Sequence, residues 1–363
     1  MRIKTLVVDD SVVVRRTVAN VLADADDIEV VATASDGRMG LRRIAELHPD
    51  VVTLDVEMPG MDGLATLAEI RRMWPELPVI MYSTLTERGA AATLEALSLG
   101  AADYATKPSG ARDREEVADQ VRANLLPLVR LWGRRSAPRG VPRRATAPAA
   151  AAPTAPVTTT ADNGGPIKLI AVGVSTGGPD ALAALLPTLP GNLPVPVVIV
   201  QHMPPVFTAM LAQRLNGLSA LTVSEATDGE RVLPGHAYIA PGGKHVELRQ
   251  GAGGLVMTLT DGAPENSCKP AVDVLFRTAT AATRGQLLGV VLTGMGADGL
   301  AGSRLIRQAG GPVLVQDEAS SVVWGMPGYV AREGLATGVL PLDGLGAAMT
   351  RIAQRSSFAA VSP

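Results

Sequence analysis

The feature that most constrains this 363-residue chain is its repeated alternation of short Val/Ile/Leu runs with longer amphipathic stretches. Continuous runs of β-branched residues, each followed by a helical pattern, indicate parallel strands that helices cover on both faces. The alternation occurs on both sides of a segment that lacks it, so the sequence predicts two α/β domains, each a doubly wound parallel sheet. The predicted strands are Ile3–Val8, Val30–Ala34, Val51–Leu54, Val79–Tyr82 and Asp103–Thr106, then Leu169–Val174, Val195–Gln201, Ala237–Ala240, Leu287–Leu292 and Pro312–Val315.

The segment between the two halves, residues 128–165, is rich in Pro, Ala, Thr and Arg and has no apolar periodicity. A segment of this composition buries almost nothing, so we predict a semi-extended linker between a first domain, 1–127, and a second domain, 166–363. The first domain has a net charge of −7 and the second a net charge of zero, whereas the linker holds six Arg and one Asp. Binding of an acidic surface or nucleic acid is the alternative to a solvated linker, which we favour.

Composition argues against several classes of protein. The single cysteine excludes a disulfide framework and a cysteine-rich zinc site, and it favours a reducing cytoplasm. Aromatic residues make up only 3% of the chain, which disfavours stacking platforms for single-stranded nucleic acid. No run approaches 18 apolar residues, and the N-terminus lacks the apolar region of a signal peptide. We therefore expect a cytoplasmic protein without membrane spans.

In the first half, polar side chains follow several predicted strands at the point where each strand ends. Asp9 and Asp10 follow the first strand, Asp55 the third, Ser83 the fourth and Lys107 the fifth. The carboxyl ends of parallel strands meet at one edge of a sheet, so we expect these side chains to converge. Clustered carboxylates repel one another unless a cation lies among them, and ligation by oxygen alone favours Mg²⁺. An aspartate there can accept a phosphoryl group while a lysine and a hydroxyl hold its oxygens.

A single aspartate after a strand is more often a helix N-cap than a ligand. The combination of DD, D-x-x-MP-x-x-DG and KP, each in register with a strand end, argues against that interpretation. Residues 1 to about 125 resemble a response-regulator receiver domain, whose fold is flavodoxin-like. The resemblance implies that Asp55 is the phosphoacceptor and that Asp9, Asp10 and Asp55 surround Mg²⁺. The residues that it implies for the phosphate switch are Ser83, Tyr104 and Lys107.

The second half opens with a strand, a glycine-rich turn and a helical pattern, in which residues 173–179 read GVSTGGP. A strand–glycine–helix junction directs backbone N–H groups toward whatever lies there. The glycines can admit a pyrophosphate to the helix N-terminus, as in a dinucleotide site, or Ser175 can be a nucleophile with oxyanion donors beside it. Tight packing of the strand against the helix is a third interpretation. The motif alone does not decide among the three.

The strands that follow favour the nucleophile. The predicted strand Val195–Gln201 ends at His202, where a dinucleotide site wants an acidic residue for the ribose. The predicted strand Leu287–Leu292 runs into a glycine-rich loop that carries Asp298. A serine hydroxyl needs a base to take its proton, and the base works best when a carboxylate fixes its tautomer. Ser175, His202 and Asp298 are therefore the candidate nucleophile, base and orienting acid.

The other candidate side chains fit structural roles better. His48 lies in the first half, far from this site, and His236 and His245 flank a loop without directly following a long apolar strand. Cys268 has no histidine nearby in the sequence, so we interpret it as incidental.

Six stretches of the second half resemble, in order, the catalytic domain of the chemotaxis protein-glutamate methylesterases, the CheB family, which is Rossmann-like. They are VGVSTGGP, VIVQHMP, YIAPGGKH, KPAVDVLF, VLTGMGADG and VVWGMP. The order Ser…His…Asp differs from that of α/β-hydrolases, which disfavours that fold. The resemblance implies a catalytic triad of Ser175, His202 and Asp298, with Thr176 and Met295 beside it. Residues 265–269, ENSCK, depart from the more basic stretch that we expect there.

The same resemblance implies a phosphorylation-regulated hydrolase that demethylates glutamate γ-methyl esters, and deamidates glutamines, on methyl-accepting chemoreceptors. It implies a histidine kinase of the chemotaxis type as phosphodonor, no cofactor for ester hydrolysis, no nucleic acid and no direct membrane insertion, and we expect a monomer. A response regulator with a DNA-binding output domain is the rival class, but the neutral second domain has no helix-turn-helix pattern. A dinucleotide-binding oxidoreductase ranks third, because the acid for the ribose is missing.

Overall fold

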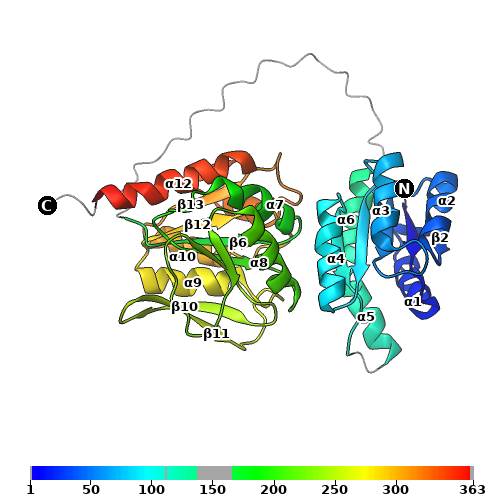
Figure 1. Ribbon diagram of the computed structural model, residues 1–363, viewed down its shortest axis with the longest axis horizontal. Coiled ribbons are helices and arrows are strands. Elements are labelled where there is room, and N and C mark those ends of the chain that lie inside the picture. Colours follow the sequence, from blue (N-terminus) through cyan, green and yellow to red (C-terminus); the bar gives the residue numbers. More distant parts are fainter. Residues whose placement is uncertain (1, 111–112, 137–165, 360–363) are drawn as a thin grey trace, which may run out of the picture. The chain divides into compact units, whose positions relative to one another are not determined.

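The computed structural model describes residues 2–110, 113–136 and 166–359, and the chain forms two compact units, residues 1–148 and 149–363 (Figure 1). Each unit contains a parallel β-sheet with helices packed against it, which confirms the predicted α/β class. The ten predicted strands agree with the observed ones to within two residues at either end. The agreement arises because buried parallel strands appear in a sequence as continuous β-branched runs.

The first unit is a five-stranded parallel sheet in the order β2-β1-β3-β4-β5. Its strands are β1 Ile3–Val8, β2 Ile28–Ala34, β3 Val51–Asp55, β4 Val79–Ser83 and β5 Asp103–Thr106. Its helices are α1 Val12–Ala23, α2 Gly37–Leu47, α3 Gly63–Met73, α4 Glu87–Ser98, α5 Arg114–Asn124 and α6 Leu126–Ser136. A Ser, Thr or Asp side chain caps the N-terminus of each helix from α1 to α5, so local chemistry sets these boundaries.

Helix α6 corrects the predicted start of the linker at residue 128. Residues 126–136 are helical and contact β1 and β3. Val129 is fully buried in the same apolar cluster as Ile3, and a Cβ atom added to Gly133 would lie 2.1 Å from the Cγ2 atom of Ile3. The N-terminal part of the predicted linker is therefore a close-packed helix of the first unit. The rest of it, residues 137–165, lies outside the described residues.

The arginines of the predicted linker raised the alternative of binding to an acidic surface, and the fold gives two of them, both in α6, a partner within the first unit. Arg130 donates to the carboxylate of Asp27 at 2.9 Å, and Arg134 contacts the same carboxylate at 2.9 Å. The hydrogen bond from Arg130 lowers the pKa of Asp27. Sequence patterning missed the helix because the composition was taken over residues 128–165 as a whole, where the Pro-, Ala- and Arg-rich residues after Trp132 outweigh the apolar positions Val129 and Trp132.

The second unit is a seven-stranded parallel sheet in the order β14-β13-β12-β6-β7-β9-β8, with a separate antiparallel hairpin of β10 and β11. Its strands are β6 Leu169–Val174, β7 Val197–Gln201, β8 Thr222–Glu225, β9 His236–Ile239, β10 His245–Gly251, β11 Gly254–Thr260, β12 Leu287–Val291, β13 Val313–Gln316 and β14 Gly338–Leu340. Its helices are α7 Gly178–Leu185, α8 Phe207–Leu218, α9 Val272–Thr283, α10 Leu300–Gln308, α11 Met326–Arg332 and α12 Leu342–Ala359.

The topology of this second sheet positions the candidate site. Strand β6 lies between β12 and β7, and all three are parallel, so their carboxyl ends are neighbours. The hairpin β10–β11, which the sequence did not predict, packs its β10 strand against α9 (Figure 1). Helix α9 also contacts β6 and therefore approaches the centre of the sheet.

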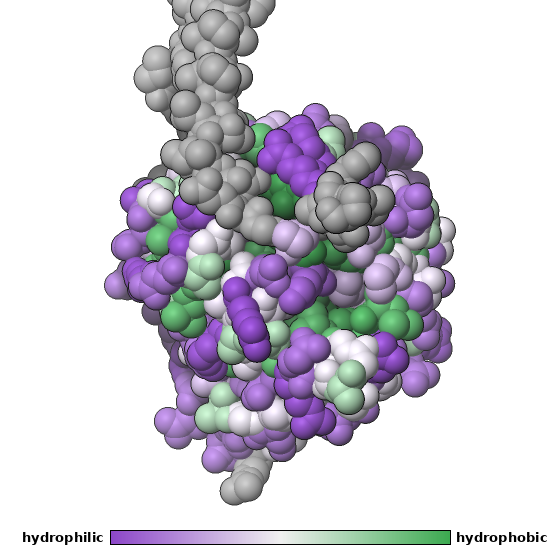
Figure 2. Space-filling model, turned by 90° about the vertical axis from the view of Figure 1, so that its left-hand side faces the viewer, coloured by the Kyte–Doolittle hydropathy of each residue, from purple (hydrophilic) through white to green (hydrophobic). Residues whose placement is uncertain are grey.

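Hydrophilic side chains cover most of the second unit's face in Figure 2, and hydrophobic ones form small separate groups. Within residues 2–110, 113–136 and 166–359, no helix combines the length and the apolar composition that a bilayer crossing requires.

Candidate functional site

Ser175 lies directly after β6, in the turn that leads into α7. Its backbone N–H donates to the carbonyl oxygen of Thr293 at 3.0 Å, so the turn is tied to the loop after β12. Gly177 has a φ of +74°, a left-handed conformation that favours glycine. A Cβ atom added to Gly178 would lie 1.9 Å from the Oε1 atom of Gln201. The Gln201 side chain therefore packs directly against the start of α7, and any side chain at position 178 would collide with it.

His202 and Asp298, called the His–Asp pair below, meet beyond the carboxyl ends of β7 and β12. The Nε2 atom of His202 lies 2.7 Å from the Oδ2 atom of Asp298. The side chain of Asp298 is 3% exposed and that of His202 is 12% exposed. Residues that are 96 positions apart in the chain thus form one mostly buried hydrogen-bonded pair.

Asp298 accepts hydrogen bonds from several further donors. Its Oδ2 atom accepts from the backbone N–H of Val272 at 2.7 Å, and its Oδ1 atom accepts from the backbone N–H groups of Asp273 and Gly299, each at 3.0 Å. The Nδ2 atom of Asn266 donates to the same Oδ1 atom at 2.9 Å. Val272 and Asp273 open helix α9, whose N-cap Ala271 makes no side-chain cap. Asp298, in the loop after β12, therefore caps the N-terminus of α9.

These contacts determine the protonation of the pair. Burial raises the pKa of Asp298, but hydrogen bonds from His202 and from backbone N–H groups outweigh burial and hold the pKa below its ordinary value. Burial lowers the pKa of His202, but hydrogen bonds to Asp298 and Cys268 outweigh it and raise that pKa to about 9. Because ionised Asp298 only accepts, Nε2 of His202 carries a proton and Nδ1 is the nitrogen that can take up another.

The structure does not join Ser175 to His202. In the described part of the chain, the Ser175 hydroxyl makes no hydrogen bond to the imidazole, and the Nδ1 atom faces the Sγ atom of Cys268 at 3.5 Å. Cys268, which the sequence led us to interpret as incidental, thus lies beside the candidate base. The fold brings it to His202 across 66 positions of sequence, so no local pattern could have revealed the contact.

The remaining predicted residues of the second unit lie as follows. The carbonyl oxygen of Thr176 accepts from the Thr293 hydroxyl at 3.0 Å, next to Ser175. Met295 follows Gly294, where an added Cβ atom would lie 2.8 Å from the Cβ atom of Ser175, and Met295 itself is 40% exposed. His245 is buried, and both of its ring nitrogens bond to the backbone.

In the first unit, Lys107 joins the two buried aspartates. Its Nζ atom lies 2.9 Å from Asp9 and 2.7 Å from Asp55. Burial raises the pKa of Asp55 to about 6 and also raises the pKa of Asp9, although Lys107 opposes both shifts. Burial lowers the pKa of Lys107, but Asp55 and Asp9 outweigh it and raise that pKa. Asp10 lies exposed beside them.

The carboxylates of this pocket suit a divalent cation. Ligand oxygens of Asp9, Asp10 and Asp55 lie within 4.8 Å of one another. The set contains only oxygen donors, and Lys107 neutralises just one of its three charges. Oxygen ligands with excess negative charge are what Mg²⁺ prefers.

The two other predicted switch residues lie on neighbouring strands. Ser83 ends β4 and is fully buried, and its carbonyl oxygen accepts from the backbone N–H of Lys107 at 2.7 Å. Tyr104 lies on β5, and burial raises the pKa of its hydroxyl. His48 is exposed at the end of α2, as expected.

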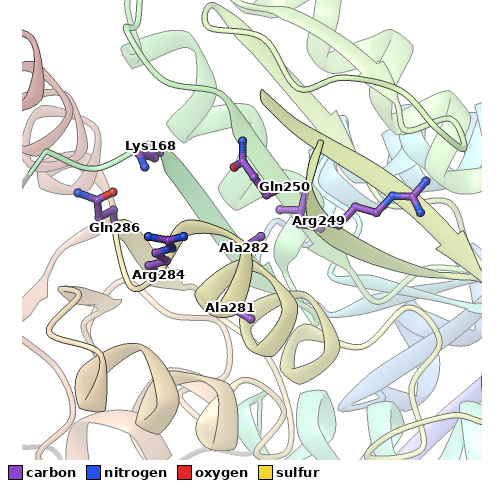
Figure 3. A pocket seen from close by; sticks show the side chains of 8 residues that line it. Lys168, Arg249, Gln250, Ala281, Ala282, Arg284 and Gln286 are labelled. Carbon is purple, nitrogen blue, oxygen red and sulfur yellow. The ribbon is translucent and has the colours of Figure 1, made fainter. Parts of the chain in front are cut away.

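A cavity at the opposite edge of the second sheet belongs to neither site. Figure 3 shows Lys168 and Gln286, which directly precede β6 and β12, together with Arg249, Gln250 and Arg284 around it. Lys168 and Gln286 lie at the amino ends of strands whose carboxyl ends lead to Ser175 and Asp298. The cavity is therefore remote from the His–Asp pair.

Known proteins match both units. Residues 170–349 match the CheB methylesterase family, and residues 5–119 match the response regulator receiver domain. A protein-glutamate methylesterase/protein-glutamine glutaminase of Trichodesmium erythraeum is 48% identical, over 95% of this chain and 97% of its own length. The chain belongs to the CheB methylesterase family.

Two further similarities agree with this family. A protein-glutamate methylesterase/protein-glutamine glutaminase of a Nocardioides species is 50% identical over 96% of this chain and 95% of its own length. The crystal structure of the catalytic domain of a Thermotoga maritima CheB methylesterase is 42% identical, with a TM-score of 0.50, and covers 51% of this chain and 98% of that domain. The solved domain matches about half of this chain, as expected if it corresponds to one of the two units.

Proposed function

We propose that this CheB methylesterase hydrolyses the γ-methyl esters of glutamate side chains on methyl-accepting chemoreceptors and deamidates glutamines on the same proteins. The observation that carries the proposal is the His–Asp pair, with its 2.7 Å hydrogen bond, at the carboxyl ends of the strands that flank the Ser175 strand. A buried carboxylate that fixes an imidazole beside a serine is the arrangement of a serine hydrolase.

Each residue of the proposed triad has one task. The Ser175 hydroxyl attacks the side-chain carbonyl carbon, and Nδ1 of His202 takes the serine proton, because Nε2 already donates to Asp298. Asp298 keeps the imidazole in that tautomer and stabilises its positive charge. The proton then passes from His202 to the leaving methoxide or amine, and methanol or ammonia departs. Water, deprotonated by His202, attacks the acyl-enzyme and regenerates Ser175 with a glutamate product.

The first unit supplies the regulation in this proposal. Asp55 accepts a phosphoryl group from a chemotaxis-type histidine kinase, while Asp9, Asp10 and Asp55 hold Mg²⁺, which neutralises phosphate charge when bound. Lys107 holds a phosphate oxygen, and Ser83 and Tyr104 respond to the modification. Until Asp55 is phosphorylated, the receiver restrains the esterase. A monomer in the cytoplasm stays a prediction from the sequence.

Methanol release from methylated receptor fragments tests the function directly. The wild-type chain should release methanol, the Ser175→Ala chain should not, and an organophosphonate serine trap should label the wild type only. A purified chain that neither releases methanol nor reacts with the trap would be a response regulator with a non-enzymatic output, and the proposal would be wrong.

A further inference from the structure

Residues 265–268, called the 265–268 turn below, form a tight turn three residues before the start of helix α9 at Val272. Glu265 and Cys268 exchange two backbone hydrogen bonds, of 3.1 and 2.9 Å. Asn266 and Ser267 both have left-handed backbones, with φ of +53° and +63°. The carboxylate of Glu265 accepts two hydrogen bonds of 2.9 Å from Arg277 of α9, which anchors the turn to that helix. Two successive left-handed residues without glycine are uncommon and need support from their surroundings.

The two side chains of this turn that face inward reach both members of the His–Asp pair. Asn266 donates from Nδ2 to Asp298 at 2.9 Å and to the buried carboxylate of Asp273 at 2.9 Å. Cys268 places its Sγ atom 3.5 Å from Nδ1 of His202. The turn therefore contacts the orienting acid through one residue and the free nitrogen of the base through another.

Both contacts involve atoms that the proposed reaction uses: the carboxylate of Asp298 and the Nδ1 atom of His202. Asn266 separates the carboxylates of Asp298 and Asp273, which would otherwise repel each other, and burial raises the pKa of Asp273. The Sγ atom of Cys268, 3.5 Å from Nδ1, occupies the position from which Ser175 must give up its proton. A role in packing alone explains neither contact, because each joins polar atoms of the turn to the reacting machinery.

We propose that Asn266 and Cys268 are positioning residues for the esterase reaction: Asn266 holds Asp298, and Cys268 holds the proton-accepting nitrogen of His202 until Ser175 replaces it. The inference rests on the proposed esterase function. The titratable groups that face His202 are Asp298, from the loop before α10, and Cys268. Behind them, Asp273 on α9 is bonded to Asn266, and Glu265 is paired with Arg277.

Cys268→Ser tests the contact with the base. Serine keeps a hydrogen-bonding group but removes the sulfur whose contact with Nδ1 helps to raise the pKa of His202. The acid limb of kcat for methanol release should move to lower pH by roughly one unit. The matched control is Ser267→Asn, which keeps a residue suited to the left-handed conformation and touches neither member of the pair. Its acid limb should coincide with that of the wild type.

Asn266→Asp tests the contact with the acid. Aspartate has the same shape and also tolerates the left-handed backbone, but it places a third carboxylate beside Asp298 and Asp273. We expect kcat to fall on the order of 10²-fold, as for a displaced catalytic group, with KM little changed. A variant with wild-type kcat would overturn the role of Asn266.

A second measurement separates this inference from the proposed function. Long-range ¹H–¹⁵N spectra of ¹⁵N-histidine-labelled full-length chain follow the four histidines, and His202→Ala identifies the signals of His202. The titration midpoint of His202 should be lower in Cys268→Ser than in the wild type, whether or not methanol is released. Equal midpoints would overturn the role of Cys268, whereas a shifted midpoint in a chain without esterase activity would contradict only the proposed function.

Discussion

The two sites of this chain place a buried aspartate against a cationic partner, yet they shift its pKa in opposite directions. Asp55 has Lys107 at 2.7 Å and one backbone donor, Glu57, at 3.3 Å, and burial raises its pKa to about 6. Asp298 has His202 at 2.7 Å and four further donors, and its pKa is lowered. The number of hydrogen-bond donors around the carboxylate accounts for the difference.

This difference assigns two roles to one residue type. A carboxylate with few donors keeps lone pairs for a metal ion or for attack on phosphorus, so Asp55 suits a nucleophile. A carboxylate whose oxygens are all engaged cannot attack, but it stays ionised and holds its partner in one orientation, so Asp298 suits an orienting acid. The predictions that follow test this contrast.

The largest expected effect comes from Ser175→Ala, which removes the nucleophile of the second site only. Methanol release should fall by four orders of magnitude or more, and the double change Ser175→Ala/His202→Ala should lose little beyond either single change, since the triad acts as a unit. Phosphate incorporation from acetyl phosphate should not change. Near-full esterase activity in Ser175→Ala would refute the assignment.

Replacing each aspartate by asparagine should separate the two roles. Asp298→Asn should lower kcat by roughly 10⁴-fold, because an amide favours the wrong tautomer of His202. Asp55→Asn should abolish Mg²⁺-dependent phosphate uptake from acetyl phosphate, because the nucleophile is gone. Radiolabelled phosphate and methanol release measure both activities in each variant. The contrast fails if Asp55→Asn still incorporates phosphate.

Removal of the receiver should have a smaller effect. A chain that starts at Pro166 should hydrolyse receptor esters about 5–150-fold faster than the unphosphorylated full-length chain, the range that a coupling of ~1–3 kcal/mol gives. Addition of acetyl phosphate should not change the hydrolysis rate of this truncated chain. Equal rates for the two chains on the same methylated receptor would mean that the receiver does not inhibit, and delivery of the enzyme to its substrate would be its better explanation.

The smallest effect concerns stability and follows from the sign of the two pKa shifts. Asp55 binds its proton more tightly in the folded than in the unfolded chain, so its ionisation costs folding free energy as pH rises from its ordinary pKa through about 6. Asp55→Asn should therefore stabilise the first unit at pH 8 by about 1–3 kcal/mol and have little effect below pH 4. Asp298 has the opposite sign: its contribution is present above its ordinary pKa and lost as pH falls.

Thermal unfolding of the wild type, Asp55→Asn and Asp298→Asn at pH 4 and pH 8 tests this prediction. Asp298→Asn should be less stable than the wild type at pH 8, and Asp55→Asn more stable. Destabilisation of the first unit by Asp55→Asn at pH 8 would show that contacts of the carboxylate with Lys107 outweigh its burial.

Local patterns were enough to locate ten of the fourteen strands in the described residues and to place polar residues at the ends of several of them. Continuous apolar runs identified β1, β6 and their neighbours, and side-chain caps such as Ser11 and Asp36 limited the helices. The patterns failed where stability comes from contacts far along the chain. Helix α6 depends on burial of Val129 and on arginines paired with Asp27, and the hairpin β10–β11 depends on packing against α9.

The candidate site likewise has features that local sequence predicts and features that only long-range contacts determine. Residue order and strand ends alone establish that a serine, a histidine and an aspartate follow three parallel strands, because strand formation depends on local side-chain pattern. Only the folded chain decides that Nε2 of His202 meets Asp298, that Nδ1 faces Cys268 and that Asn266 holds the acid. These contacts join residues that are 32 to 96 positions apart, and their distances depend on how a short turn packs between α9 and the sheet.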